Sequence, residues 1–331
     1  MKAALLPDRG VVKLAGDAAQ GFLNGLLTAD IAQVAPAQPR FAALLTPQGK
    51  IVVDVIVAEA PAADGGGFFL DCPRALAGEL VQKLNFYKLR AKVMAEDLSE
   101  ALGVLAVWDG ARFQAEWAPV SRPESAPTQD SGARSDAKPV PIFAERAPDT
   151  EYGLVYPDPR LPALGARVML PPHLTEQAAA DLGAELVDAA AYEAHRIALG
   201  VPRGGMDFIY GDAFPHETDM DQLHGVDFEK GCYVGQEVVS RMEHRGSSRN
   251  RIVPIAAELT VPEAGLPVMA GERQVGVTGS AAGPHGLAML RLDRVADAFA
   301  AGTPLVAGGI TISPRKPTWA KFQWPGEKVA E

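Results

Sequence analysis

The C-terminal part of the chain is divided into short apolar runs by glycine and proline. After Gly246 the runs read RIVPIAA, LPVMAG, QVGVTGS, GLAMLRL, TPLVAGG and ITISP. Several short strands with turn residues between them are typical of a small β-sandwich or β-barrel. We therefore predict an all-β module after a boundary between Arg245 and Arg251, and we place it at residues 246–331.

Residues 1–245 mix strands with helices. The apolar residues of VVKL (residues 11–14) predict a strand, and the spacing from Phe22 to Leu27 predicts a helix after it. The stretch FAALLTPQGKIVVDVIVAEA predicts two strands with a turn between them. Asp54 stands alone in the second of these strands, and a position on a solvated face is favoured over a buried functional carboxylate. Because 331 residues exceed what one compact core usually holds, two α+β subdomains are expected in this region.

Between about residues 116 and 138 the composition shifts to proline, serine, alanine and glycine (APVSRPESAPTQDSGARSDAKP). A segment with so few large apolar residues cannot bury enough surface to fold by itself. We interpret it as a flexible surface insertion and not as a domain.

Charge and cysteine usage limit the partners and the location of the protein. The net charge of -10 argues against a general nucleic-acid binder, whose affinity depends on neutralising phosphates. The two cysteines cannot form a disulfide framework, which fits a reducing compartment. No apolar run approaches the roughly 20 residues of a membrane-spanning helix, and no secretory signal is evident. A soluble, cytoplasmic protein without membrane contact is expected.

One of the two cysteines, Cys232, lies in the stretch FEKGCYVGQEVVSRMEHRG (residues 228–246). Apolar residues from Val234 to Met242 follow helical spacing, which places Cys232 in or just before the first helical turn. The helix N-terminus and Lys230 would both lower the pKa of its thiol below the ordinary value of about 8.5. A buried structural cysteine is the alternative interpretation, and the sequence pattern leaves both open.

Two clusters of charged residues need an interpretation. The first contains His216, Glu217, Asp219, Asp221 and His224. Its histidines lack the spacing of a helical metal site and no second cysteine is near, so a solvated acidic loop is expected and no metal site is predicted. The second contains Arg241, His244, Arg245, Arg249 and Arg251. It is interpreted as a solvated hinge, or as a site for an anionic group.

The octapeptide KGCYVGQE (residues 230–237) resembles the signature of the YgfZ family, folate-binding relatives of the glycine-cleavage T-protein, an aminomethyltransferase. Other segments resemble family segments in the expected order: FLNGLLTADI, LLTPQGKIVVDVIV, FYKLRAKV, RIALGVPRGGMDF and FPHETDMDQLHGVDF. The resemblance covers essentially the whole chain except the insertion. It implies a T-protein-like α+β fold, in which subdomains surround a central folate pocket and a C-terminal β-barrel closes one side.

The resemblance also implies a function. Mitochondrial members of the family act in the maturation of iron–sulfur proteins. The chain is therefore expected to be a folate-binding accessory factor in the assembly or repair of iron–sulfur clusters, with effects on iron–sulfur enzymes that modify tRNA. Its expected cofactor is tetrahydrofolate. Its expected partners are iron–sulfur proteins or their assembly machinery, and the chain is expected to be a monomer.

The same resemblance assigns the candidate site residues. Cys232 is expected to be the working residue, as a thiolate that handles sulfur, iron or a one-carbon adduct. The residues expected to support it are Lys230, Gly231, Tyr233, Gly235, Gln236, Glu237 and Arg241. The residues expected to contact folate are Arg196, Glu217, Tyr233 and Arg241.

Two departures from the T-protein pattern weigh against its reaction. The T-protein carries a catalytic carboxylate seven residues after a strand-end asparagine, and counting from Asp71 this position is Gly78, unless Glu79 substitutes. The T-protein element R-x-E-x-G has Ala198 in place of the glutamate that contacts the pterin. Whether the chain catalyses a reaction stays open. The alternatives are an aminomethyltransferase or other one-carbon transferase, and a non-catalytic folate-binding scaffold.

Overall fold

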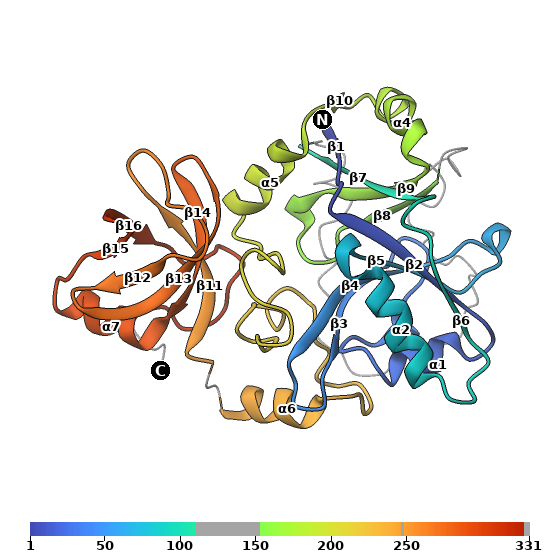
Figure 1. Cartoon of the computed structure of the whole chain (residues 1–331), viewed down its shortest axis with the longest axis horizontal. Coiled ribbons are helices and arrows are strands. Elements are labelled where there is room, and N and C mark those ends of the chain that lie inside the picture. Colours follow the sequence, from blue (N-terminus) through green and yellow to red (C-terminus); the bar gives the residue numbers. More distant parts are fainter. Residues whose placement is uncertain (110–152, 246–247, 328–331) are drawn as a thin grey trace, which may run out of the picture.

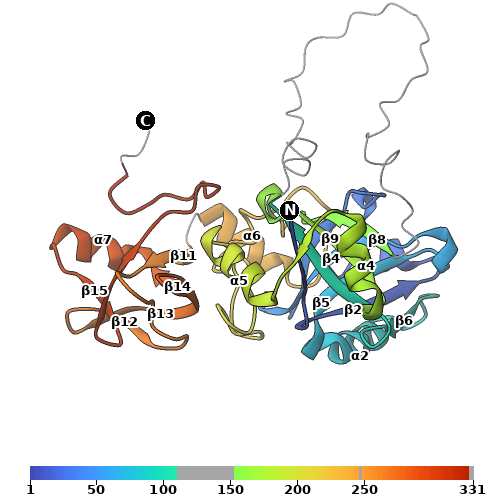
Figure 2. The same cartoon turned by 90° about the horizontal axis from the view of Figure 1, so that it is seen from above.

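A computed structural model describes residues 1–109, 153–245 and 248–327. The insertion expected at residues 116–138 lies outside these ranges. The described residues form two five-stranded sheets and a closed barrel. Both views show the barrel on one side of the molecule and the two sheets on the other, with α5 and α6 between them (Figure 1, Figure 2).

The first sheet is antiparallel and runs in the order β3-β4-β5-β2-β6. Its strands are β2 (Arg9–Ala15), β3 (Arg40–Leu45), β4 (Ile51–Glu59), β5 (Phe68–Pro73) and β6 (Met94–Asp97). Helices α1 (Ala19–Asn24) and α2 (Ala77–Tyr87) pack on one face. Because alternate strand residues point to opposite faces, Val12 and Leu14 face these helices while Val11 joins the central core.

The second sheet runs in the order β10-β1-β7-β9-β8. Its strands are β1 (Lys2–Leu5), β7 (Gly103–Trp108), β8 (Leu154–Pro157), β9 (Ala166–Leu170) and β10 (Glu185–Leu186). Leu105 and Val107 of β7 pack with α4 (Thr175–Asp181). The alternate residues Ala106 and Trp108 face the central core, which also contains residues of α5 (Ala189–Ala198).

The C-terminal module is a closed barrel in the order β11-β14-β13-β12-β15-β16. Its strands are β11 (Asn250–Ala256), β12 (Pro267–Ala270), β13 (Arg273–Ala282), β14 (His285–Arg291), β15 (Leu305–Ala307) and β16 (Ile310–Pro314). One helix, α7 (Leu292–Ala300), packs against this core. The barrel predicted from the glycine- and proline-separated runs is confirmed, and so is the α+β fold before it. The division of domains at residue 245 stays a prediction.

The segment between α5 and the barrel connects the parts of the molecule. It runs as a long loop from Leu199 to Gly235 and then forms α6 (Gln236–Arg245). Leu223, Val226 and Tyr233 of this loop belong to the central core, together with residues of both sheets. The short 3₁₀ helices are η1 (Ile31–Gln33), η2 (Ala62–Asp64), η3 (Arg74–Leu76), η4 (Pro162–Leu164) and η5 (Pro172–Leu174). Within the ranges that the structure describes, no helix combines the length and the apolar character needed to cross a membrane.

Candidate functional site

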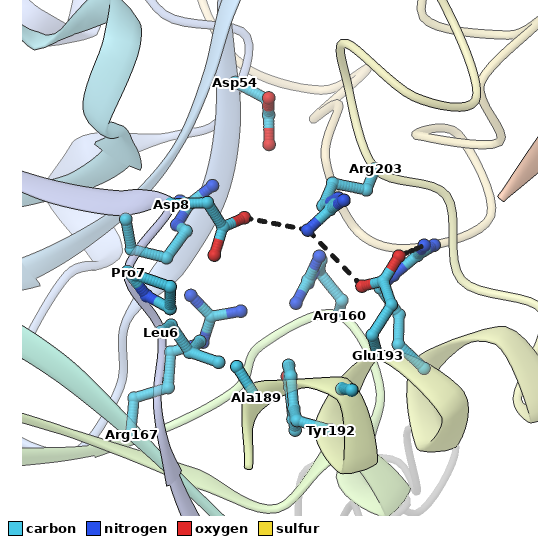
Figure 3. Close-up of a pocket in the computed structure, with 13 residues that line it drawn as sticks. Leu6, Pro7, Asp8, Asp54, Arg160, Arg167, Ala189, Tyr192, Glu193 and Arg203 are labelled. Atoms are coloured by element: carbon cyan, nitrogen blue, oxygen red, sulfur yellow. Dashed lines mark hydrogen bonds and ion pairs between the residues drawn. The ribbon is translucent and has the colours of Figure 1, made fainter. Parts of the chain in front are cut away.

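A cavity of about 210 Å³ lies where the β1–β2 connection faces α5 and the loop that follows it (Figure 3). Its lining is mostly charged. The arginines are Arg9, Arg160, Arg167, Arg196 and Arg203. The carboxylates are Asp8, Asp54 and Glu193. Arg160 and Arg203 extend into the middle of the cavity, and Asp54 lies above them in the view (Figure 3).

Two buried carboxylates behind this lining hold the arginines in place. Asp71 of β5 pairs with Arg9 at 2.6 Å and with Arg167 at 2.5 Å. Asp158 pairs with Arg160 at 2.6 Å and with Arg167 at 3.0 Å. All five side chains are almost completely buried. The result is a continuous buried ion-pair network that joins the two sheets, because β5 belongs to the first and β9, which carries Arg167, to the second.

The arginines of this network determine the ionisation states of its two carboxylates. Burial alone would raise the pKa of Asp71, but Arg167 and Arg9 outweigh it and hold that pKa below its ordinary value. Asp158 behaves in the same way, because Arg160 and Arg167 outweigh burial and lower its pKa. Burial and the neighbouring Asp71 raise the pKa of Tyr156, whose hydroxyl donates to Asp71 at 3.0 Å. Both carboxylates therefore stay ionised and the tyrosine stays neutral around neutral pH.

Arg196 is the one expected folate contact that lines the cavity, but its guanidinium is fully used by the protein. Its Nε and Nη2 donate to Glu193, and its Nη1 donates to the Val201 carbonyl and to Asp207 at 2.9 Å. Its Nη2 also donates to the hydroxyl of Ser280 in β13, at 2.7 Å. Arg196 thus fastens α5 to the barrel, and no donor is left for a ligand.

Asp54 is also placed differently from the sequence expectation. The residue is 8% exposed and lines the cavity, so the solvated strand face expected for it is wrong. One of its oxygens accepts from the hydroxyl of Tyr210. Burial and Asp54 together raise the pKa of Tyr210, which keeps that hydroxyl protonated. The sequence did contain a signal, namely an isolated carboxylate in an apolar strand. It was taken as a sign of exposure, whereas the residue is buried.

Cys232 is exposed, and the structure shows where it lies relative to the helix and to Lys230. Helix α6 begins at Gln236, so Cys232 lies in the preceding loop and not in the first helical turn. The ammonium of Lys230 donates to the carbonyls of Asn24, Leu27 and Ala29 at 2.7, 2.7 and 2.8 Å. Lys230 therefore anchors the loop to the end of α1 through three backbone carbonyls.

Gly235 provides the second anchor of the cysteine loop. Its φ is +84°, and a Cβ there would lie 2.6 Å from the Thr46 carbonyl oxygen and 3.2 Å from the Cα of Gly49. The loop thus lies directly on the β3–β4 turn, at a distance that only glycine permits. Gly231 differs, since a Cβ there would meet no atom within 4 Å.

Gly235→Ala is expected to lower the free energy of unfolding by about 1–3 kcal/mol, because alanine adds both backbone strain and a steric clash. Thermal and denaturant unfolding of the purified variant measure this loss. Gly231→Ala is the matched control, and its expected change is within about 0.5 kcal/mol because nothing opposes the added methyl group. Equal stability of the two variants would contradict the proposed packing of the loop.

The two cysteines differ sharply in accessibility. Cys72 lies in β5 with no exposed surface, and burial raises the pKa of its thiol to about 12. We therefore expect iodoacetamide at pH 8 to modify Cys232 in the native protein and to reach Cys72 only after unfolding, since the thiolate is the reactive form. Mass spectrometry of peptides from native and guanidinium-treated protein measures the two rates. Comparable native labelling of both cysteines would refute this assignment.

The other residues expected to support Cys232 or contact folate are scattered. Glu217 accepts from the Phe214 amide at 3.0 Å and from Asn250 at 2.8 Å, so it joins the loop to the barrel. Tyr233 is buried, and burial raises its pKa. Arg241 is exposed on α6 and pairs with Glu237 of the same helix at 2.6 Å. Gln236 is the first residue of this helix. None of them lines the cavity.

The cluster from His216 to His224 is not a solvated acidic loop, and this expectation is wrong. His216 and Asp219 are 2% and 0% exposed, and Arg251, expected in a solvated hinge, is 6% exposed. Arg251 donates to both oxygens of Asp221 at 2.6 and 2.9 Å, which ties the loop to β11. Burial raises the pKa of Asp219 well above its ordinary value despite Arg251 nearby. The neutralising arginine follows about 30 residues later, so local composition could not reveal it.

His216, Asp221 and Glu243 bring possible metal-ligand atoms within 4.8 Å of one another. Glu243 already pairs with His216 at 3.0 Å, and Arg251 occupies both oxygens of Asp221. A guanidinium bound to one carboxylate opposes a cation at the same place. Arg251 therefore already compensates the charge of Asp221 in this cluster.

Gly78 and Glu79, which the T-protein comparison singled out, are exposed on α2. Glu79 pairs with Lys83 at 3.4 Å on the helix surface. Neither residue lines the cavity. The carboxylates that do line it, on β4, α5 and the β1–β2 connection, were not assigned a role from the sequence.

Comparison with known proteins identifies similar chains. Residues 249–322 match a family model described as "CAF17, C-terminal beta-barrel domain". The chain is 33% identical over 277 residues to the iron–sulfur cluster assembly factor IBA57 homolog of Mycosarcoma maydis, with 80% of this chain and 60% of that protein covered. It is 31% identical over 310 residues to iron–sulfur cluster assembly factor IBA57 of Mus musculus, with 88% and 77% covered. The chain spans 52% of the Neurospora crassa relative.

A structural comparison supports the fold. The glycine cleavage system aminomethyltransferase T of Bartonella henselae superposes with a TM-score of 0.66 at 17% identity, covering 98% of this chain and 87% of the other. The T-protein-like fold expected from the resemblance is confirmed. At this identity the likeness concerns the fold alone.

The expected location needs a correction. The relatives from Mycosarcoma maydis, Neurospora crassa and Mus musculus are all named as mitochondrial proteins. The cytoplasmic location predicted from the sequence is therefore wrong. A low cysteine count fits a reducing compartment, but it does not separate the cytoplasm from other reducing compartments.

Proposed function

Because the chain belongs to the family of the iron–sulfur cluster assembly factor IBA57, we propose that it is an accessory factor in the assembly or repair of iron–sulfur clusters. The observation that carries this proposal is the exposed thiol of Cys232 on a firmly anchored loop. The chain spans only part of its fungal relatives, so its activity and partners are proposed and are not transferred from their names.

The loop presents the Cys232 thiol in a way that suits the transfer of iron or sulfur to a partner protein. Thiolate sulfur is the protein ligand preferred by iron–sulfur clusters. Lys230 and Gly235 fix the backbone on both sides of Cys232, while Gly231 leaves its surroundings open. A thiolate that is fixed but accessible can bind iron by replacing another iron ligand, or take the outer sulfur of a persulfide donor that leaves as a thiolate. The reverse exchanges would pass iron or sulfur to iron–sulfur proteins or their assembly machinery.

Two narrower expectations belong to the same proposal. The octapeptide KGCYVGQE supports placing the chain in the YgfZ branch, in which Cys232 is the central residue. An effect on iron–sulfur enzymes that modify tRNA would follow from reduced cluster supply to those enzymes. Both rest on the resemblance of the motif.

Tetrahydrofolate fits the cavity poorly. The cavity of about 210 Å³ is smaller than the roughly 300–1,000 Å³ usual for ligands of drug size, and such sites are mainly apolar. Here eight of the thirteen lining residues are arginines or carboxylates, and the donors of Arg196 are all used by the protein. Folate binding is proposed on family resemblance only, and no chemical step is assigned to it. The exposed positions of Gly78 and Glu79 likewise give the aminomethyltransferase alternative no support.

A complementation experiment tests the proposal. A strain that lacks its own family member is expected to regain iron–sulfur enzyme activities, including those of tRNA-thiolating enzymes, when it expresses this chain. Enzymes without clusters serve as the control and should not change. Failure to restore the cluster enzymes, with soluble protein present at normal levels, would reject the assembly role.

A further inference from the structure

Two buried arginines that line the cavity have N–H groups without an acceptor among the described residues. Arg160 uses Nε and Nη2 for Asp158, at 2.9 and 2.6 Å. Arg9 uses Nε for the Asp71 carboxylate at 2.6 Å and Nη2 for the Asp71 carbonyl at 2.8 Å. Among the described residues no group accepts from Nη1 of either arginine. Both arginines are more than nine-tenths buried and both line the cavity, so a ligand in the cavity is within reach of donors that the protein leaves free.

Two further donors line the same space. Arg203 directs Nη1 to Asp8 at 3.0 Å and lies 3.4 Å from Glu193, which leaves its Nε and Nη2 free in the described structure. The hydroxyl of Tyr192 is completely buried and has no hydrogen-bond partner among the described residues. A buried hydroxyl without a partner is unfavourable, so its place in the cavity wall points to a ligand that accepts from it.

These donors surround one space from different sides. Arg160 and Arg203 extend into it from one side, and Tyr192 rises toward it from α5 (Figure 3). Planar guanidinium groups match the oxygens of carboxylates and phosphates, and charge-assisted hydrogen bonds to such oxygens are stronger than neutral ones. We propose that this cavity binds a small oxyanion, a carboxylate or a phosphate, through Arg9, Arg160, Arg203 and the hydroxyl of Tyr192.

Asp54 limits the ligand that the cavity accepts. Its second oxygen has no hydrogen-bond partner in the described chain and adds a negative charge to the wall. This charge opposes the binding of an anion on that side, so its removal is expected to strengthen binding. The oxyanion could be a free metabolite or the glutamate tail of a folate, since both present carboxylates.

The test is calorimetry on the full chain in a low-salt chloride buffer. The probes are citrate, inorganic phosphate, tetrahydrofolate, and a reduced pterin that lacks the glutamate tail. Citrate or phosphate is expected to bind, and the pterin without a tail is not. Competition distinguishes the sources, because tetrahydrofolate displaces citrate only if its tail occupies the site. This assay does not depend on the role in cluster assembly.

Variants distinguish anion binding in the cavity from a general effect of the protein's charge. Tyr192→Phe and Arg203→Gln are each expected to weaken citrate or phosphate binding about tenfold, the effect of losing one hydrogen bond to a charged group. Tyr192→Phe removes an oxygen without a protein partner, so the fold is retained. Asp54→Asn is expected to strengthen binding. Arg273→Gln, an exposed arginine of the barrel paired with Asp297, is the matched control and should change nothing.

Three results would overturn the proposal. One is the absence of citrate and phosphate binding at millimolar concentration. Another is that Tyr192→Phe and Arg273→Gln weaken the binding of citrate or phosphate equally, or that neither variant weakens it. The third is tight binding of the tail-free pterin that citrate cannot displace.

Discussion

Asp71→Ala is expected to lower the free energy of unfolding by about 3–5 kcal/mol, the usual effect of removing one partner from a buried ion pair. The side chain of Asp71 has no exposed surface and pairs with Arg9 and Arg167. Without it, Arg167 keeps Asp158 as an ion-pair partner, while Arg9 keeps no ion pair among the described residues. The buried ion-pair network that joins the two sheets would lose the carboxylate that pairs with both arginines.

Denaturant unfolding, followed by circular dichroism, measures this loss. Asp297→Ala is the control, because Asp297 pairs with Arg273 at 3.0 Å but both side chains are largely exposed. Such exposed pairs contribute about 0–1 kcal/mol. If Asp71→Ala does not unfold more easily than Asp297→Ala, the buried network is not a main support of the fold. Asp71→Asn keeps the shape and provides a folded variant for comparison.

Asp71 also determines how the stability of the fold changes at acid pH. Because the folded state lowers the pKa of Asp71, its ionised form stabilises the fold above the unfolded pKa of about 4. This contribution is lost as the pH falls below that value. We expect unfolding measured between pH 5 and about pH 2 to show a smaller loss of stability in Asp71→Asn than in the wild type.

The barrel could be predicted from the sequence because its signal is local. Glycine and proline between short apolar runs specify turns and strands within each few residues. The helix at Gln236–Arg245 was also predicted, but its start was placed too early. Gly235 explains this difference, since its positive φ and its contact with Thr46 end the extended loop only there.

The cavity could not be predicted, because its parts come from distant segments. Arg9 and Asp71 are 62 residues apart, and Asp71 and Arg167 are 96 residues apart. A signal existed, namely single charges inside otherwise apolar strands. Without their partners such charges are expected at the surface, and only the fold shows that they neutralise one another.

The candidate site was predicted in part. The resemblance drew attention to Cys232, and the thiol is exposed as its proposed role requires. The activation of this thiol by the helix N-terminus and Lys230 stays a prediction, and the backbone carbonyls that bind Lys230 were not foreseen. Those carbonyls lie about 200 residues earlier in the chain, so no local pattern could place them.

Cys232→Ala is expected to abolish the restoration of iron–sulfur enzymes while leaving the fold intact. The side chain is exposed, so its loss should change stability by no more than about 0.5 kcal/mol. If the thiol carries iron or sulfur, no neighbouring side chain can replace it, because Cys72 is buried. Cys232→Ser keeps the shape of the side chain without a thiolate and should fail equally.

The most direct test of this account is iron–sulfur enzyme activity in a strain that lacks its own family member. The strain would express the wild type, Cys232→Ala, Cys232→Ser, or Glu229→Ala as a control at an exposed neighbouring position. Immunoblots would establish equal protein levels. The account predicts restored activity with the wild type and Glu229→Ala, and none with either Cys232 variant. Full restoration by Cys232→Ala at equal protein level would contradict it and leave the thiol without a role.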